Sequence, residues 1–430
     1  MRETRRSAHP LPAWCPVRSA RRTAARAAAL VILAGGAALL GGALVALRVA
    51  RDVVTPPRRR KEDVAILGVD RTAGTVRLGR TPDTIVPGRY SLWFDHDRGH
   101  ARVGAIVEHD EVSVLRRLEG VQRGDLERAS RGRWAGWWYL TPSDLNVPFS
   151  EVGIETPVGV APAWRIEPES ASDAWAVVVH GRGVTRAEGL RAVGVFRAAG
   201  YRCLLISYRN DGDAPPSHDG RYALGDEEWR DVEAAVVYAR TEGARRIVLM
   251  GWSMGGATVL QCITRSPLAE HIDGVVLESP VVDWIPTLRF QAAAAGLPPA
   301  VRDAALAMLG SGRASSWVGL AEPIDFERLD IVARAAELSI PMLLLHSDDD
   351  GYVPSGASIA LAAARPDVVR LERFAIARHT KLWNYDPQRW ERAIRVWLAD
   401  QGLYAATDAG TSARTARPRR PRAAAAPSAG

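Results

Sequence analysis

The chain has 430 residues, of which 47% are apolar and 24% charged, an ordinary composition for a globular protein with one large domain and a smaller one. Its net charge of +7 comes from the two ends: residues 1–61 carry +11 and residues 404–430 carry +4, which leaves −8 for residues 62–403. An acidic folded part offers no basic groove, so nucleic-acid binding is excluded. The three cysteines have neither metal nor disulfide spacing.

The N-terminal region contains one long apolar segment. Residues 1–26 are rich in Arg, have no apolar period and are predicted to be disordered. Residues 27–47 are uncharged and lie between Arg26 and Arg48; as a helix they reach about 30 Å, which predicts a transmembrane helix. A secretory signal cut near Ala46 or Ala50 is the alternative, but its apolar core is usually only about 7–15 residues long.

The basic residues on the two sides of this segment nearly balance, so they only weakly favour one orientation. We expect a single-pass membrane protein with its N-terminus inside and its catalytic domain extracytoplasmic.

Residues 62–147 are predicted to form a small β-rich module. Short alternating runs are separated by Gly, Asp and Pro turns, which is typical of strands. The expected strands are Val64–Val69, Thr75–Leu78, Tyr90–Phe94, Arg102–Glu108 and Glu111–Leu115. The histidines and aspartates around His96 have no metal-ligand spacing and are interpreted as a polar hairpin turn, so no metal site is predicted.

Residues 148–402 alternate between strand and helix patterns. The continuous apolar strands Ala174–Val179 and Arg246–Gly251 are each followed by a helical pattern, which predicts an α/β fold: a mostly parallel sheet with helices on both faces. Residues 284–330 interrupt the rhythm with Ala-rich helical sequence and are expected to form a cap insert. Residues 403–430, rich in Ala, Arg and Pro, are predicted to be a disordered tail.

A serine lies where one of these strands turns into a helix, in Gly251-Trp252-Ser253-Met254-Gly255. Such a turn holds the serine in a strained backbone conformation that exposes its hydroxyl, and side chains at the two glycines would collide. A serine hydroxyl also needs a base and a group that orients the base. Aspartates and a late histidine, His379, follow Ser253 in the chain.

Four motifs together resemble the alpha/beta-hydrolase superfamily over residues 148–402, most closely its branch of esterases, monoacylglycerol lipases and serine aminopeptidase-like proteins. They are His180-Gly181, the Gly251–Gly256 turn, the segment His346–Pro354 and the late His379. The resemblance implies that Ser253 is the nucleophile and His379 the base, with His346 and His180 in structural roles.

The resemblance also implies the acid and the oxyanion hole. An aspartate three residues before the Val of Val353-Pro354 selects Asp350, with Asp348 as runner-up and Glu278 as a more distant alternative. The backbone N–H groups of Met254 and Arg182 are the candidate oxyanion donors, and the Arg182 side chain is expected to face solvent. No cofactor is predicted.

The predicted function is a membrane-anchored serine hydrolase that cleaves an ester, thioester or amide of a small-molecule acyl substrate through an acyl-enzyme. Peptidase activity ranks below esterase activity, because there is neither a propeller-length N-terminal repeat nor a second-site acid pattern. Two alternatives stay open: acyl transfer by the same residues, and a catalytically silent hydrolase fold that serves as a binding module. The sequence does not indicate the oligomeric state.

Overall fold

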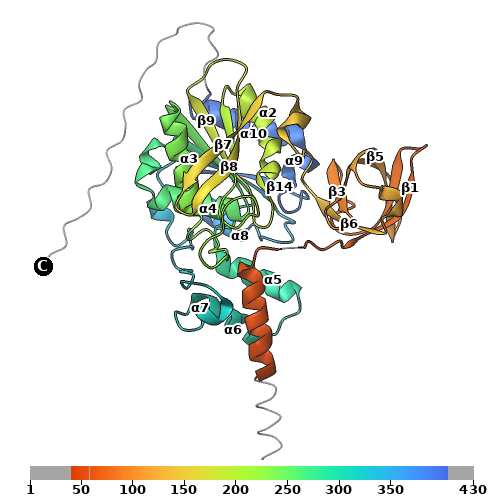
Figure 1. Cartoon of the computed structure of the whole chain (residues 1–430), viewed down its shortest axis with the longest axis horizontal. Helices are drawn as coiled ribbons and strands as arrows, with labels where there is room; N and C mark the ends of the chain where they lie inside the picture. Colours follow the sequence, from red (N-terminus) through yellow and green to blue (C-terminus); the bar gives the residue numbers. More distant parts are fainter. Residues whose placement is uncertain (1–39, 58, 405–430) are drawn as a thin grey trace, which may run out of the picture.

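The computed structural model describes residues 40–57 and 59–404 (Figure 1). It consists of a closed β-barrel and a larger α/β domain, with an N-terminal helix at residues 40–54 beside the larger domain. The predicted disordered ends, residues 1–26 and nearly all of 403–430, lie outside the described residues.

The barrel has six antiparallel strands in the order β1-β2-β5-β4-β3-β6, and β1 also pairs with β6 to close it. The strands are β1 (Val64–Asp70), β2 (Thr75–Gly79), β3 (Tyr90–Phe94), β4 (Gly99–His109), β5 (Ser113–Arg123) and β6 (Arg131–Ala135). Alternating apolar side chains fill its interior, as in small closed barrels generally. The β-rich module is thus present, with one strand more than expected.

The barrel also encloses a cation that no pattern predicted. Arg116 is fully buried, and its guanidinium lies against the rings of both Tyr90 and Trp134, 5.2 and 5.1 Å from their centroids. It donates to four backbone carbonyls at 2.8–2.9 Å, those of residues 84, 86, 88 and 104. Burial lowers the pKa of Arg116 to about 10, and these bonds satisfy the charge inside the barrel.

The larger domain is built on an eight-stranded sheet in the order β14-β13-β12-β11-β9-β10-β8-β7. Its strands are β7 (Phe149–Thr156), β8 (Gly159–Ile166), β9 (Ala174–Val179), β10 (Arg202–Ile206), β11 (Arg246–Trp252), β12 (Gly274–Glu278), β13 (Met342–Ser347) and β14 (Val369–Phe374). The pairs β7–β8 and β8–β10 at one edge are antiparallel, and the other strand pairs of this sheet are parallel. The predicted mostly parallel sheet is confirmed.

Helices cover both faces of the sheet, and alternate residues of the central strands face each layer. In β9, Val177 and Val179 face one hydrophobic cluster, whereas Ala176 and Val178 face the other. One layer contains α3 (Trp229–Thr241), α4 (Met254–Arg265) and α8 (Gly356–Ala364); the other contains α2 (Leu190–Ala198), α9 (Leu382–Tyr385) and α10 (Pro387–Asp400). Apolar strands with two buried faces are typical of parallel sheets.

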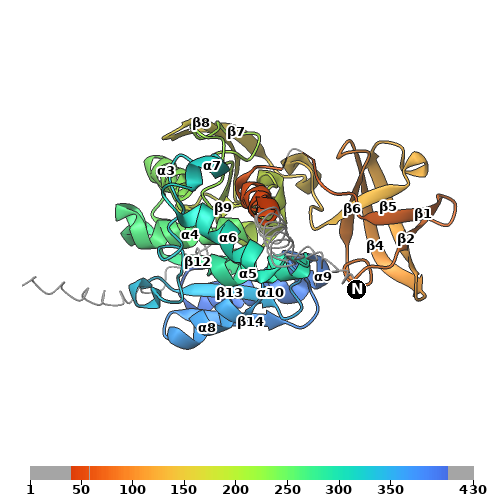
Figure 2. The same ribbon diagram turned by 90° about the horizontal axis from the view of Figure 1, so that it is seen from below.

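The predicted cap insert forms three helices, α5 (Trp284–Ala294), α6 (Pro299–Gly310) and α7 (Ser315–Val318). They lie beside the N-terminal helix in both views (Figures 1 and 2). Ala46, Ala50 and Val54 of that helix are fully buried and belong to the same hydrophobic cluster as the cap.

The predicted transmembrane segment, residues 27–47, is only partly described. Residues 27–39 lie outside the described residues, and residues 40–47 form the first half of the N-terminal helix. In the part of the chain that the structure describes, no helix is both long and apolar enough to cross a membrane.

The packed chain runs two residues beyond the predicted domain end at 402. Leu403 is buried, and its carbonyl accepts a hydrogen bond from the Tyr201 hydroxyl. The Tyr404 carbonyl accepts one from Arg246 at 3.0 Å.

Candidate active site

Ser253 lies in the turn between β11 and α4, with φ 50° and ψ −117°. A Cβ added to Gly251 would lie 2.7 Å from the Gly255 carbonyl oxygen, and one added to Gly255 would lie 2.3 Å from the His180 carbonyl oxygen. Both glycines are therefore required by close backbone approach, which is the reason that the sequence motif suggested.

The structure brings Ser253, His379 and Asp350 together across 126 residues of sequence. His379 Nε2 lies 3.0 Å from Ser253 Oγ, and His379 Nδ1 lies 2.8 Å from Asp350 Oδ2. Because an ionised carboxylate only accepts, Nδ1 carries the proton and Nε2 is left to accept from the serine hydroxyl. Ser253 is 7% exposed, so the hydroxyl remains reachable from a cavity.

The Asp350 carboxylate is held by its own turn. Its Oδ1 accepts from the backbone N–H groups of Tyr352 and Val353, at 2.9 and 2.8 Å. Burial alone would raise the pKa of Asp350, but the imidazoles of His379 and His346 lower it well below its usual range. Asp350 is therefore ionised at neutral pH.

The other acid candidates point elsewhere. Asp348 forms a surface ion pair with Arg373 at 2.9 Å. The Glu278 carboxyl accepts from the Leu382 N–H and the Trp390 indole N–H, on the α9–α10 side of the sheet. Neither carboxyl contacts His379.

His346 and His180, the two histidines expected to have structural roles, have buried hydrogen-bond partners. His346 lies 2.8 Å from the Ser358 hydroxyl and 2.9 Å from the Val353 carbonyl oxygen. His180 lies 3.0 Å from the Asp211 carboxylate and stacks on Tyr208, with 4.3 Å between ring centroids.

The peptide that joins Gly181 to Arg182 is fixed in orientation. The Gly181 carbonyl accepts a hydrogen bond from the Tyr208 hydroxyl and lies within hydrogen-bonding distance of His180 Nδ1, both at 2.8 Å. The Gly181 N–H donates to Glu188 at 2.8 Å. Since the carbonyl and the N–H of one peptide point in opposite directions, holding this carbonyl also holds the Arg182 N–H, a candidate oxyanion donor.

The side chain of Arg182 does not face solvent, and this expectation was wrong. Its guanidinium donates to the carbonyls of Asp52, Val53 and Thr55, at 2.7, 3.0 and 3.0 Å. These carbonyls lie at the C-terminal end of the N-terminal helix, where a cation is favoured by the unsatisfied carbonyls and the helix dipole. No local pattern signals this contact, because its partners lie about 130 residues upstream.

The barrel reaches the loop that carries His379. Asp83 pairs with Lys381 at 3.1 Å and with Arg378 at 3.6 Å, on either side of the histidine. Arg378 and Thr380 have positive φ values of 62° and 51°, which is a strained conformation for residues other than glycine.

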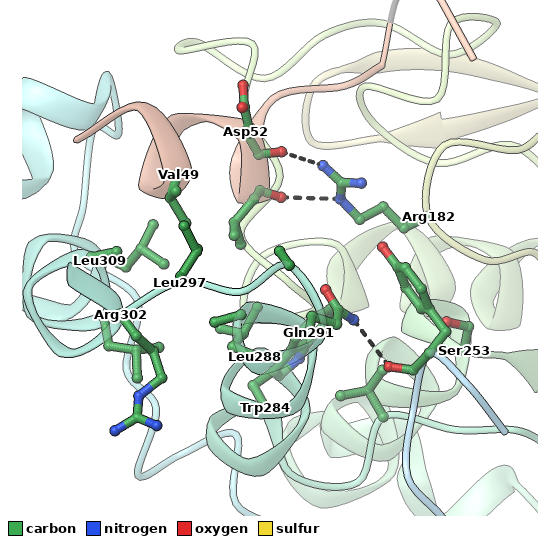
Figure 3. Close-up of a pocket in the computed structure, with 17 residues that line it drawn as sticks. Val49, Asp52, Arg182, Ser253, Trp284, Leu288, Gln291, Leu297, Arg302 and Leu309 are labelled. Carbon is green, nitrogen blue, oxygen red and sulfur yellow. Dashed lines mark hydrogen bonds between the residues drawn. The ribbon is translucent and has the colours of Figure 1, made fainter. Parts of the chain in front are cut away.

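An apolar cavity of about 290 Å³ opens at Ser253 and extends between the cap and the N-terminal helix (Figure 3). It is lined by Val49, Asp52, Val53, Arg182, Ser253, Val281, Trp284, Leu288, Gln291, Ala292, Ala295, Leu297, Arg302, Ala305, Leu306, Leu309 and Tyr352. The predicted cap insert thus supplies most of the lining, and the N-terminal helix and the loops of the sheet domain supply the rest.

Two families match parts of the chain. Residues 170–318 match the family described as serine aminopeptidase, S33. Residues 65–135 match a domain of unknown function (DUF8805), which coincides with the barrel. No curated protein matches the chain.

Several solved structures are similar to the larger domain. An esterase from Pyrococcus furiosus is 20% identical, with a TM-score of 0.48 over 61% of this chain and 96% of its own. A putative aryl esterase from Burkholderia cenocepacia is 20% identical, with a TM-score of 0.43 over 59% of this chain and 99% of its own. Est1E from Butyrivibrio proteoclasticus, solved with ferulic acid, is 16% identical, with a TM-score of 0.46 over 58% and 98%. Identities this low do not indicate a shared substrate.

The matched family and the sheet topology assign the chain to the alpha/beta-hydrolase superfamily, which confirms the resemblance seen in the sequence. The larger domain thus has the alpha/beta-hydrolase fold, and a small N-terminal barrel precedes it.

Proposed function

We propose that the protein is a serine hydrolase that cleaves a carboxylic ester through an acyl-enzyme. One observation carries the proposal: the unbroken chain from Ser253 Oγ through His379 to the buried Asp350, with distances of 3.0 and 2.8 Å. A hydroxyl, an imidazole and a carboxylate at these distances are what an activated serine nucleophile needs.

The proposed reaction has two steps. Ser253 Oγ attacks the ester carbonyl while His379 Nε2 takes the hydroxyl proton, and the Met254 and Arg182 N–H groups donate to the developing oxyanion. The C–O bond to the alcohol then breaks, and the alcohol leaves with the proton from His379. Water, deprotonated by the same histidine, attacks the acyl-enzyme and releases the acid and Ser253.

A fluorophosphonate probe tests the nucleophile on the full chain. We expect stoichiometric labelling of wild-type protein at Ser253 and none of Ser253→Ala. A folded wild-type protein without labelling would favour the silent binding module instead. Ser266, a buried serine at the far end of α4, provides the matched control, and Ser266→Ala should be labelled like wild type.

The reaction class is tested with a substrate panel of short esters, long esters and aminoacyl amides. We expect turnover of esters and little of the amides. Preferred cleavage of aminoacyl amides would assign the protein to the peptidases instead.

We also propose that residues 27–47 anchor the enzyme to a membrane with the catalytic domain on the extracytoplasmic side. The support is the uncharged sequence itself, long enough to span a bilayer as a helix. Alkaline carbonate extraction should leave the protein in the membrane fraction, and a C-terminal reporter enzyme should be active only when exported. A carbonate-extractable protein, or a reporter active in the cytoplasm, would contradict the anchor or its orientation.

A further inference from the structure

The N-terminal helix at residues 40–54 forms one wall of the cavity above Ser253. Figure 3 shows Val49 on the helix side of the cavity and Trp284 and Leu288 on the α5 side, with Ser253 at one end and Leu309 at the other. Val53, one turn further along the helix, also lines the cavity.

This wall is attached to the rest of the site at several points. The Arg182 side chain binds the last carbonyls of the helix, and the backbone of the same residue belongs to the oxyanion loop. Arg51 donates to the Trp317 carbonyl of the cap at 2.7 Å, and the Tyr222 N–H donates to the Val54 carbonyl at 2.8 Å. The helix is therefore part of the site and does not merely lie near it.

The charged residues of the lining are already paired. Asp52 pairs with Arg48 at 3.1 Å, and Arg302 pairs with Asp303 at 2.9 Å. Arg182 is occupied by the helix carbonyls. The remaining surface beyond Ser253 is mainly apolar, so the cavity offers no free charge to a charged acyl group, and an aliphatic chain fits its chemistry.

We propose that the helix at residues 40–54 is the outer wall of an acyl-binding site. The substrate class is an ester of an aliphatic carboxylic acid, with its chain lying from Ser253 toward Leu309 between this helix and α5–α6. Val49 and Val53 then determine the acyl length that the enzyme accepts. This inference rests on the proposed serine hydrolase function, because it assigns the acyl group to the same nucleophile.

The test is the chain-length profile of the full-length protein with p-nitrophenyl esters from acetate to dodecanoate. We expect wild-type kcat/KM to rise with acyl length up to a limit. Val49→Trp fills the cavity and should lower the ratio of long-chain to short-chain kcat/KM at least tenfold. Val49→Ala removes bulk and should move the optimum to longer chains.

Leu44→Trp is the matched control, since Leu44 is on the same helix but 67% exposed and does not line the cavity. Its profile should remain that of wild type. Fluorophosphonate labelling at Ser253 shows, for each variant, that the site is folded.

The inference is overturned if labelled Val49→Trp and Val49→Ala keep the wild-type profile, or if wild type is labelled but prefers acetate to all longer chains. Both results leave the serine hydrolase function intact. Absence of labelling in wild-type protein would instead remove the proposed function and the inference with it.

Discussion

Two other aspartates stand directly before Asp350 in the chain, so the acid of the proposed reaction has to be chosen among three neighbouring carboxylates. Asp348 pairs with Arg373 on the surface, and Asp349 accepts hydrogen bonds from the Ser347 hydroxyl and the Arg378 N–H. Only Asp350 contacts His379. Asparagine at this position would present an amide in place of the carboxylate and would no longer stabilise the imidazolium that forms during the reaction.

We therefore expect Asp350→Asn to lower kcat by about four orders of magnitude, since the carboxylate sets the tautomer of the base. Asp348→Asn should keep nearly full activity, because an exposed ion pair contributes only about 0–1 kcal/mol to stability. Ester turnover by the two purified variants shows whether Asp350 or Asp348 is the acid. Loss of activity in Asp348→Asn with retention in Asp350→Asn would reverse the assignment.

For individual residues, the sequence predicts candidate catalytic roles better than it predicts long-range contacts. Asp350 and His379 follow from motif spacing, and the structure brings both to Ser253. The Arg182 side chain was misjudged because solvent is the usual environment of an isolated arginine, whereas here distant helix carbonyls provide acceptors. Glu188 and Tyr208, which orient the Gly181 peptide, were missed because neither lies in a catalytic motif.

Among the elements, the barrel has a direct connection to the histidine loop. Besides the Asp83 ion pairs, the Arg89 N–H donates to the Asn384 carbonyl at 3.0 Å, and the Asn384 amide donates to the carbonyls of Arg89 and Gly136. From the other side, Arg191 donates to the Thr380 carbonyl at 2.7 Å. A strained loop keeps its conformation only when its surroundings over-determine it, and the barrel supplies part of that support.

Asp83→Ala should lower kcat several-fold with little change in KM, because the base is displaced while the acyl cavity is untouched. Asp83→Glu, which retains the carboxylate, should recover part of the loss. Glu127→Ala, which removes an exposed barrel ion pair with Arg71, is the control and should behave as wild type. Steady-state ester kinetics provide the measurement. An unchanged kcat in Asp83→Ala, or a change in KM without a change in kcat, would contradict the positioning role.

The elements themselves were largely readable from periodicity. Strict alternation or continuous apolar runs marked five barrel strands and the central sheet strands, and most of these appear close to the predicted positions. The exception is β5, which runs eight residues beyond the predicted Glu111–Leu115. The sixth barrel strand, Arg131–Ala135, was missed because its Arg-Gly-Arg start shows no apolar alternation. It forms because pairing with β1 and β3 closes the barrel, a tertiary effect that no local window contains.

Across the whole molecule, pH sensitivity should come partly from Glu228, a fully buried carboxyl at the start of α3. Burial raises its pKa to about 7, even though the N–H groups of Ala223 and Gly225 each donate to it at 2.8 Å. In the unfolded chain the group releases its proton near pH 4.3. Between these values the native state binds more protons, so the free energy of unfolding should fall as pH rises from about 4.5 to 7.

This group should account for at most about 4 kcal/mol of pH-dependent stability, since one pKa unit corresponds to about 1.4 kcal/mol. Glu228→Gln stays neutral, so its free energy of unfolding should lose this dependence, and its deficit against wild type should shrink between pH 4.5 and 7. Urea unfolding followed by tryptophan fluorescence measures both proteins, with Glu227→Gln, a half-buried neighbour, as control. Parallel pH curves for wild type and Glu228→Gln would rule out this origin.

The buried face of the N-terminal helix has a consequence for maturation. Ala46 and Ala50, the small residues at which a signal peptidase could have cut, are fully buried against the cap and the sheet domain. A cut after Ala46 would remove the buried first turns of the helix, and a cut after Ala50 would also remove Val49, which lines the cavity. We infer that processing of this kind would release a damaged enzyme, so that the residues leading from the N-terminal segment must remain attached for the site to keep its outer wall.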